Sequence, residues 1–227
     1  MGKNSKAKRD KKKKKTQKVK SSTQSAKPEF TMPDSFEDFI RMQGKLDKLF
    51  DPELLTSPES IDGNILEFCK LISDSEPVFI DVEPEDWCRQ SCCDLNVNEY
   101  IKANGGQIVC GYKLWYNKPN YIEGERHAVW KGNDGSLKDI TFNADGETRV
   151  LFIADVAENQ LSLEANKHKI RWGKTKQVQD LISFQEEAES MIPTQTMSDS
   201  DAWATAITYK DWSEGKRMPS HFLKVNG

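Results

Sequence analysis

The stretch from Gln107 to Ile153 constrains the fold more than any other part of the chain. Short segments rich in β-branched and aromatic residues alternate there with turn-forming residues, the pattern of an antiparallel sheet. The expected strands are 107–115, 126–131, 136–141 and 149–153. Residues 132–135 (Gly-Asn-Asp-Gly) tolerate positive φ angles, so they predict a hairpin between the second and third of these strands. Residues 116–120 are expected to form a surface loop.

Apolar residues at helical spacing precede this stretch. One helix is expected to start at Phe36, with Ser35 as its N-cap and one core-facing apolar stripe formed by Phe36, Phe39, Ile40, Leu46, Leu49 and Phe50. A second is expected after Ser57, which would cap it, with Pro58 at the first helical position. Residues 77–82 read as a short strand. Together these elements predict an α+β domain with N-terminal helices packed on an antiparallel sheet.

A pair of cysteines stands at the head of the next expected helix. This helix would begin near Ser91 or Cys93 and run to Ala103, burying Val97, Tyr100 and Ile101. A thiol in the first turn faces unpaired backbone N–H groups and the positive end of the helix dipole, which favour a thiolate and supply donors to an oxyanion. Cys93 lies one turn before Val97 and should face the sheet, whereas Cys92 is rotated by about 100°.

A histidine and an aspartate follow on the expected hairpin. His127 and Asp139 lie on adjacent strands, where side chains of opposite residues approach with Cβ atoms about 4.5–5.5 Å apart. A thiol, an imidazole and a carboxylate are the groups needed to make a thiolate nucleophile and to hold its base in place. Each of these residues is also common as a structural residue, and only their combination favours catalysis.

These residues resemble a known family. A cysteine at a helix head, a strand with Gly111-Tyr112, then His127-Ala128-Val129-Trp130 and Asp139-Ile140-Thr141 are similar to the catalytic core of transglutaminase-like and other papain-superfamily thiol enzymes. The resemblance covers residues 91–153. It implies a papain- or transglutaminase-like fold with the nucleophile helix packed on the sheet.

The same resemblance implies thiol-dependent acyl transfer, as a peptidase, amidase or transglutaminase-like enzyme acting on a protein or peptide. Cys93 or Cys92 would be the nucleophile, His127 the base and Asp139 the orienting carboxylate, with no cofactor. The Gly and aromatic residues that often precede the nucleophile in such enzymes are replaced here by residues 89–92 (Arg-Gln-Ser-Cys). Both cysteines therefore stay open, and the facing argument favours Cys93.

Two polar residues near the cysteines are further candidates. Gln90 could offer its side-chain amide to an oxyanion, and Asn96 could hold either the loop or a substrate carbonyl, the loop being the commoner role for such a residue. A metal site is disfavoured because the cysteines lack the paired Cys-x2-Cys spacing of structural zinc sites. Its ligands would come from Cys88, Cys92, Cys93, Cys110 and His127.

Charge divides the chain unevenly. Residues 1–27 hold twelve Lys/Arg and one acidic residue, which leaves 21 basic and 35 acidic residues in the other 200, a net charge of −14. We expect residues 1–32 to be a disordered basic tail, 33–192 the α+β domain, and 193–227 a linker with a short helical extension. The alternative function is a non-catalytic interaction module whose tail binds nucleic acid or an acidic partner.

The apolar runs and the cysteines bear on location. No apolar run approaches the roughly 18 residues needed to span a bilayer, so no membrane association is expected. An odd number of cysteines, three of them between 88 and 93, favours reduced thiols over a disulfide framework. A cytoplasmic, reducing location is the expectation.

Overall fold

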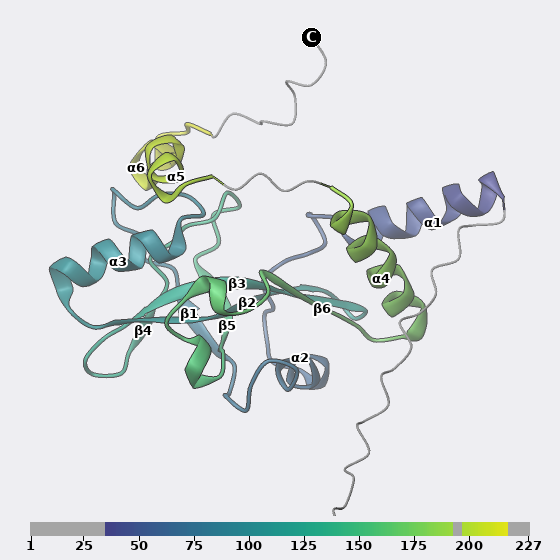
Figure 1. Ribbon diagram of the computed structural model, residues 1–227, viewed down its shortest axis with the longest axis horizontal. Helices are drawn as coiled ribbons and strands as arrows, with labels where there is room; N and C mark the ends of the chain where they lie inside the picture. The colour runs from purple at the N-terminus through teal and green to yellow at the C-terminus, as the bar shows by residue number, and fades with distance from the viewer. Residues whose placement is uncertain (1–34, 193–196, 218–227) are drawn as a thin grey trace, which may run out of the picture.

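The computed structural model describes residues 35–192 and 197–217 (Figure 1). It confirms an α+β architecture built on a six-stranded antiparallel sheet. The strands run in the order β1-β5-β2-β3-β4, and β6 also pairs with β3. Their bounds are β1 Val78–Asp81, β2 Gln107–Asn117, β3 Tyr121–Lys131, β4 Leu137–Lys138, β5 Arg149–Ala154 and β6 Lys169–Gly173. The tail expected at 1–32 lies outside the described residues.

The sheet curls until its first and last strands meet. Val82, just after β1, forms a parallel bridge with Asp139, just after β4. The Asp139 amide donates to the Asp81 carbonyl at 3.2 Å, and the Glu83 amide donates to the Asp139 carbonyl at 2.7 Å. These bonds satisfy backbone groups that an open sheet would leave exposed at its edges. Asp139 is therefore fixed by its backbone at the seam where the two edges join.

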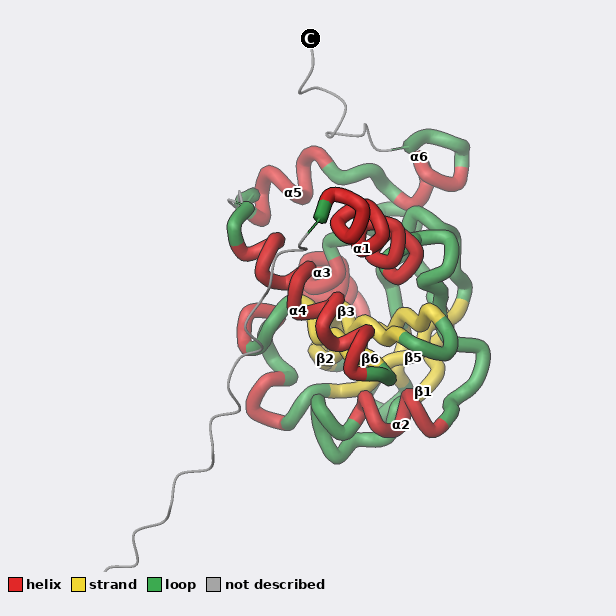
Figure 2. Tube along the Cα trace, turned by 90° about the vertical axis from the view of Figure 1, so that its right-hand side faces the viewer, coloured by secondary structure: helices red, strands yellow, loops and turns green. Residues whose placement is uncertain are grey.

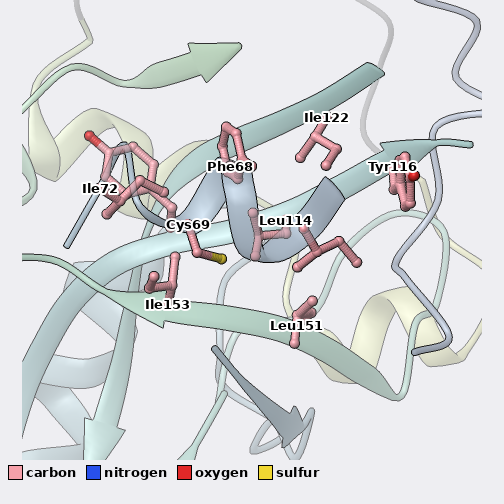
Figure 3. Packing of buried hydrophobic residues seen from close by; sticks show 10 residues of the cluster. Phe68, Cys69, Ile72, Leu114, Tyr116, Ile122, Leu151 and Ile153 are labelled. Carbon is pink, nitrogen blue, oxygen red and sulfur yellow. The ribbon is translucent and has the colours of Figure 1, made fainter. Parts of the chain in front are cut away.

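One face of the sheet is apolar and is covered by helix α2 (Gly63–Cys69). Alternate residues of β2, β3 and β5 point to this side, as the period of two in a strand requires. Phe68 packs there with Ile72 and Cys69 against the sheet (Figure 3). The buried sheet residues of this cluster are Tyr112, Leu114, Tyr116, Ile122, Leu151 and Ile153.

The opposite face carries polar side chains together with an apolar cluster of Ile80, Val109, Val129, Val150 and Phe152. It is covered at one end by α1 (Phe36–Leu49) and α4 (Lys176–Ser190). These two helices lie side by side over the sheet, away from α2 (Figures 1 and 2). Leu49 and Ile182 close this end by packing with Tyr121. Beyond the part that α1 and α4 cover, this face includes side chains of β2 and β3.

Helix α3 (Cys93–Asn104) packs along β3, and it starts at one of the two residues expected. Val97 and Tyr100 are buried as expected, in a cluster with Cys110 and Ala128 of the sheet. The helix ends at Gly105, whose φ of 68° is left-handed and suits a residue without a Cβ. Packing of α3 on the sheet thus confirms the expected position of the cysteine-bearing helix.

Three local predictions were wrong at their boundaries. Helix α2 begins at Gly63 and not after Ser57, because Asp62 caps it by accepting from the amides of Asn64 and Ile65. Residues just before Ser57 are held extended, since the Tyr116 amide donates to the Thr56 carbonyl at 2.8 Å.

The other two concern strand lengths. The surface loop expected at 116–120 is shorter, because β2 continues to Asn117 and its partner β3 begins at Tyr121 and not at the expected Arg126. The hairpin strand expected at 136–141 is reduced to Leu137–Lys138, because the chain then turns toward β1. Pairing with the next strand thus decided the first boundary, and the approach to β1 decided the second.

Helix α1 begins at Phe36 with Ser35 accepting from the Asp38 amide, as expected, but only half of its apolar stripe faces the core. Leu46 and Leu49 are buried, whereas Phe36 and Ile40 are 77% and 53% exposed. The C-terminal end of the helix lies beside α4, and its N-terminal end projects away from the sheet (Figure 1). The expectation of one continuous core-facing stripe is wrong for the first two turns.

The C-terminal part holds two short helices, α5 (Asp199–Thr205) and α6 (Tyr209–Ser213). They pack on the loop that precedes α3, where the Tyr209 amide donates to the Cys88 carbonyl at 2.8 Å. Residues 193–196 and 218–227 of the expected linker and extension lie outside the described residues. In the parts that the structure does describe, no helix combines the length and apolar character needed to cross a membrane.

Two glycines give a matched test of this packing. A Cβ at Gly111 would lie 2.1 Å from the Ile153 carbonyl oxygen, so Gly111→Ala should lower the free energy of unfolding by about 3 kcal/mol. Gly44 in α1 has nothing within 4 Å of an added Cβ, so Gly44→Ala should raise it by about 0.5–1 kcal/mol. Urea unfolding followed by circular dichroism measures both. Equal effects of the two substitutions would contradict the close approach of β2 and β5.

Candidate active site

Cys93 is the first residue of α3 and follows a turn with unusual backbone geometry. Ser91, two residues earlier, has φ of 59°, the one positive value among the described residues other than glycine. Left-handed backbone at a serine is strained by roughly 1 kcal/mol or more and is kept only where the surroundings hold it. The turn places Cys92 at the N-cap and Cys93 inside the helix. Both thiols are largely buried.

His127 and Asp139 meet as expected from the sequence. His127 Nε2 lies 2.9 Å from Asp139 Oδ2, and both side chains are buried. The contact does not arise through strand pairing, because the β3–β4 register stops at Trp130 opposite Lys138. It arises because Asp139 sits at the seam with β1, directly beyond β4.

Cys93 completes the constellation. Its side chain hydrogen-bonds to His127 and is close enough for its charge to raise the pKa of the imidazole. With Nε2 facing Asp139, Nδ1 is the ring nitrogen left for proton exchange with the thiol. The structure thus brings Cys93, His127 and Asp139 together in the order expected.

The second oxygen of Asp139 is held by the backbone. Oδ1 accepts from the Thr141 amide at 2.9 Å, a bond that fixes the carboxylate plane toward His127. Because the main chain of Asp139 is also bonded on both sides to the end of β1, the residue has little freedom to rotate away. A carboxylate anchored in this way sets the orientation of the imidazole.

The electrostatics favour a charged imidazole. Burial lowers the pKa of His127, but the charges of Asp139 and Cys93 and the hydrogen bonds to both outweigh burial and raise it to about 10. At neutral pH His127 is therefore protonated. After Asp139, the Cys93 side chain is a further cause of this shift, through its charge and its hydrogen bond to the imidazole.

Burial keeps the thiols of the other four cysteines protonated. Burial raises the pKa of Cys92 and Cys110 to about 11, and that of Cys69 and Cys88 to about 12. These four stay protonated at neutral pH and are poor nucleophiles. Of the two cysteines that the sequence left open as nucleophiles, Cys93 is the one whose side chain hydrogen-bonds to His127.

Asn96 joins the loop that precedes Cys93 to Thr141, two residues after Asp139. It is fully buried, accepts from the Arg89 amide at 2.7 Å and donates to the Arg89 carbonyl at 2.8 Å and to Thr141 Oγ1 at 3.1 Å. Of the two roles considered for Asn96, the structure shows the loop-holding one. Its position joins the two segments that carry Cys93 and Asp139.

Donors for an oxyanion are present at the start of α3. The N-cap Cys92 makes no side-chain capping bond, and the Asp94 carboxylate takes up the amides of Asp94 and Leu95. No hydrogen bond joins the Cys93 amide to another described residue. The Gln90 backbone amide donates to the Ile207 carbonyl. The Gln90 side-chain amide forms no hydrogen bond with another described residue.

The C-terminal segment contacts the loop that precedes Cys93 from outside. Arg89 forms a bridge with Thr208, donates from its guanidinium to the Ala206 carbonyl at 3.2 Å, and stacks over Trp203. Phe142, just beyond Thr141, packs against Tyr209 and Trp212 of α6. Sequence reasoning missed this role, although Trp203, Tyr209 and Trp212 are large aromatic residues of the kind that often pack against a neighbouring segment.

The possible metal ligands are not grouped as such. Over residues 35–192 and 197–217, no three His, Cys, Asp or Glu side chains are placed to hold an ion together. Cys88 and Cys110 pack instead among apolar residues, with Val97 and Ile140.

Replacing Asn96 should loosen the site. Asn96→Ala leaves the part-buried Arg89 amide and the buried Thr141 hydroxyl without this partner, while the Arg89 carbonyl keeps only the Cys92 amide, so it should lower the free energy of unfolding by about 1–3 kcal/mol. It should also slow alkylation of Cys93, because the loop before the nucleophile is no longer tied to Thr141. Chemical unfolding and mass spectrometry of the alkylated protein measure the two effects. Asn98, exposed on the same helix, gives the control Asn98→Ala.

The pKa of His127 predicts a pH dependence of stability. A pKa raised from 6.5 to about 10 on folding stabilises the protein fully below about pH 6.5, and this stabilisation is lost as pH rises toward 10. The difference in unfolding free energy between wild type and His127→Asn should therefore shrink from pH 6.5 to 10. Urea unfolding in reducing buffer over that range measures it, and a difference that grows would contradict the ion pair.

Comparison with known proteins adds no relative. No protein-family model, no curated protein and no solved structure matches this chain. Function is therefore inferred from the chemistry of the residues themselves.

Proposed function

We propose that this protein is a thiol-dependent acyl-transfer enzyme, with Cys93 as nucleophile, His127 as acid and base, and Asp139 as the residue that orients the imidazole. One observation carries the proposal: of five cysteines, the one at a helix head contacts a buried imidazole that is held on its other side by a buried carboxylate. This set of groups is needed for nucleophilic catalysis by a thiol. A structural histidine needs only one of these partners.

The first half of the reaction starts with a protonated His127 beside the Cys93 sulfur. The Cys93 sulfur attacks the carbonyl carbon of an amide or ester, and the carbonyl π electrons move to oxygen to give a tetrahedral oxyanion. In this proposal the Cys93 amide and the Gln90 side chain donate hydrogen bonds to that oxygen. When the C–N or C–O bond breaks, His127 gives its proton to the leaving amine or alcohol, and a thioester on Cys93 remains.

The second half restores the enzyme. Water or an amine attacks the thioester carbonyl, neutral His127 takes the proton of the attacking group, and the acyl group leaves the Cys93 sulfur as acid or amide. Asp139 keeps the imidazole aligned through both proton transfers and offsets its positive charge. Hydrolysis and amine transfer use the same residues, so both a peptidase or amidase and a transglutaminase-like reaction fit.

The resemblance to papain-superfamily and transglutaminase-like enzymes supports the same proposal. The order Cys, His, Asp and a cysteine opening a helix packed on an antiparallel sheet are the features that carry it. A substrate that is a protein or peptide is part of the proposal, because it is the substrate class that the resemblance implies.

Alkylation by iodoacetamide near neutral pH tests the proposal. Cys93 should be modified first, and Cys92→Ala should label like wild type while Cys93→Ala is silent at this site. His127→Ala should slow labelling by about 100-fold or more, since the thiol loses its proton acceptor. Peptide mapping by mass spectrometry identifies the modified residue. Labelling of Cys92 in Cys93→Ala at the wild-type rate would move the nucleophile to Cys92.

A different outcome would favour the non-catalytic interaction module. If none of the three substitutions changes the rate or place of labelling, no activated thiol exists in the protein. Circular dichroism of each variant shows whether it is folded, which separates loss of the thiol's activation from loss of the fold.

A further inference from the structure

A row of polar side chains beside His127 is not used by the proposed chemistry. Glu123, Glu125 and His127 alternate along β3 and so share one face, and Lys113 and Trp115 of β2 lie opposite Glu125 and Glu123. Trp115 Nε1 donates to Glu125 at 3.0 Å, and Lys113 Nζ lies 3.5 Å from the same carboxylate. The Glu125 side chain is 46% exposed. We call Lys113, Trp115, Glu123 and Glu125 the polar strip.

The polar strip ends in a cavity of about 320 Å³ under the C-terminal end of α1 and beside α4. Trp115 and Glu123 belong to both the strip and the cavity, so the two are continuous. One wall is apolar and is made by Phe50, Pro52, Leu55 and Trp115. A second hollow of about 560 Å³ adjoins the cavity and shares Phe50 and Pro52 with it.

The basic residues of the cavity are already paired. Lys169 Nζ lies 2.8 Å from Glu123 Oε1, and Arg171 Nε lies 3.1 Å from Glu123 Oε2. The guanidinium of Arg171 also holds both oxygens of Glu189, each at 2.8 Å, in a bidentate pair. An anionic ligand would have to displace these carboxylates, which makes such a ligand unfavourable.

Carboxylates without a cationic partner remain. Asp145 lines the cavity, and Asp47 and Asp51 line the adjoining hollow. None of the three forms an ion pair with another residue of 35–192 or 197–217. An apolar and aromatic wall next to unpaired carboxylates fits a side chain with an aliphatic stem and a cationic end.

Distance places the cavity within reach of the thiol. Four residues of β3 separate His127 from Glu123, which is roughly 13 Å at about 3.3 Å per residue. An extended peptide covers that length in about four residues. A peptide lying along β3 with a carbonyl at Cys93 would therefore bring a side chain about four positions away to the cavity.

We propose that the cavity is a specificity subsite for a lysine or arginine about four residues from the carbonyl that Cys93 attacks. This inference rests on the proposed function and names its substrate class, a peptide segment carrying basic residues. The acidic body of the chain favours such a substrate over an acidic one.

Binding to Cys93→Ser tests the subsite without turnover. The probes are fluorescein-labelled nine-residue Ala/Ser peptides with Arg, Leu or Glu at both ends, so that either direction along β3 is covered. Fluorescence polarisation should give Arg peptides at least about tenfold tighter binding than Glu or Leu peptides. Asp145→Lys should reduce this preference severalfold, whereas the matched change Asp74→Lys, exposed near α2 on the other face, should leave it.

Protection of the thiol links the cavity to the site. In the wild-type protein the Arg peptide should slow alkylation of Cys93 by iodoacetamide, and the Glu peptide should not. Any one of four results would overturn the proposed subsite. Two concern affinity: the Leu peptide binds most tightly, or all three peptides bind equally. The other two are that Asp145→Lys keeps the wild-type preference, or that the Arg peptide binds without protecting Cys93. Rapid alkylation of Cys93 in these cases would leave the proposed function standing. Absence of that alkylation would remove the proposed function as well.

Discussion

The hydrogen bond between His127 and Asp139 depends on the closure of the sheet. Asp139 reaches the imidazole because backbone bonds to Asp81 and Glu83 pull the chain from β4 to the end of β1. Those bonds satisfy strand edges, so they would form whatever the side chain at 139. The carboxylate then occupies a buried position where an unpaired charge would be costly, and His127 neutralises it.

The same burial explains why the site must be complete to be stable. Removing one member of a buried ion pair typically costs about 3–5 kcal/mol, because the other charge is left without a partner. Here the charge of His127 is stabilised by two neighbours, because both Asp139 and Cys93 raise its pKa against the effect of burial. Because the pKa of His127 is raised on folding, the protonated imidazole contributes to stability while it is held ready for the proposed chemistry. The left-handed φ at Ser91 beside the nucleophile, in contrast, costs stability.

Sequence reasoning found the parts that depend on local pattern. The helix of Cys93, the strand of His127 and the buried positions Val97 and Tyr100 follow from periodicity and turn residues, and they are confirmed. The His127–Asp139 contact was expected through strand pairing and occurs without it, because the pairing of β4 stops at Lys138. The start of α2 was missed because Ser57 and Asp62 are both good caps, and a distant contact between Thr56 and Tyr116 decides between them.

What could not be predicted was how distant segments meet at the nucleophile loop. Arg89 is held on one side by Asn96 of the following helix, and on the other by Ala206 and Thr208, more than 110 residues later. Neither periodicity nor capping reports a contact across that separation. The position of Cys93 is therefore set from both sides of its loop, by a polar bond within the domain and by a segment that sequence composition alone would assign to a linker. Because the backbone bonds from Gln90 and Tyr209 run through the same segment, movement of α5 and α6 would be transmitted to the start of α3, and with it to the sulfur facing His127.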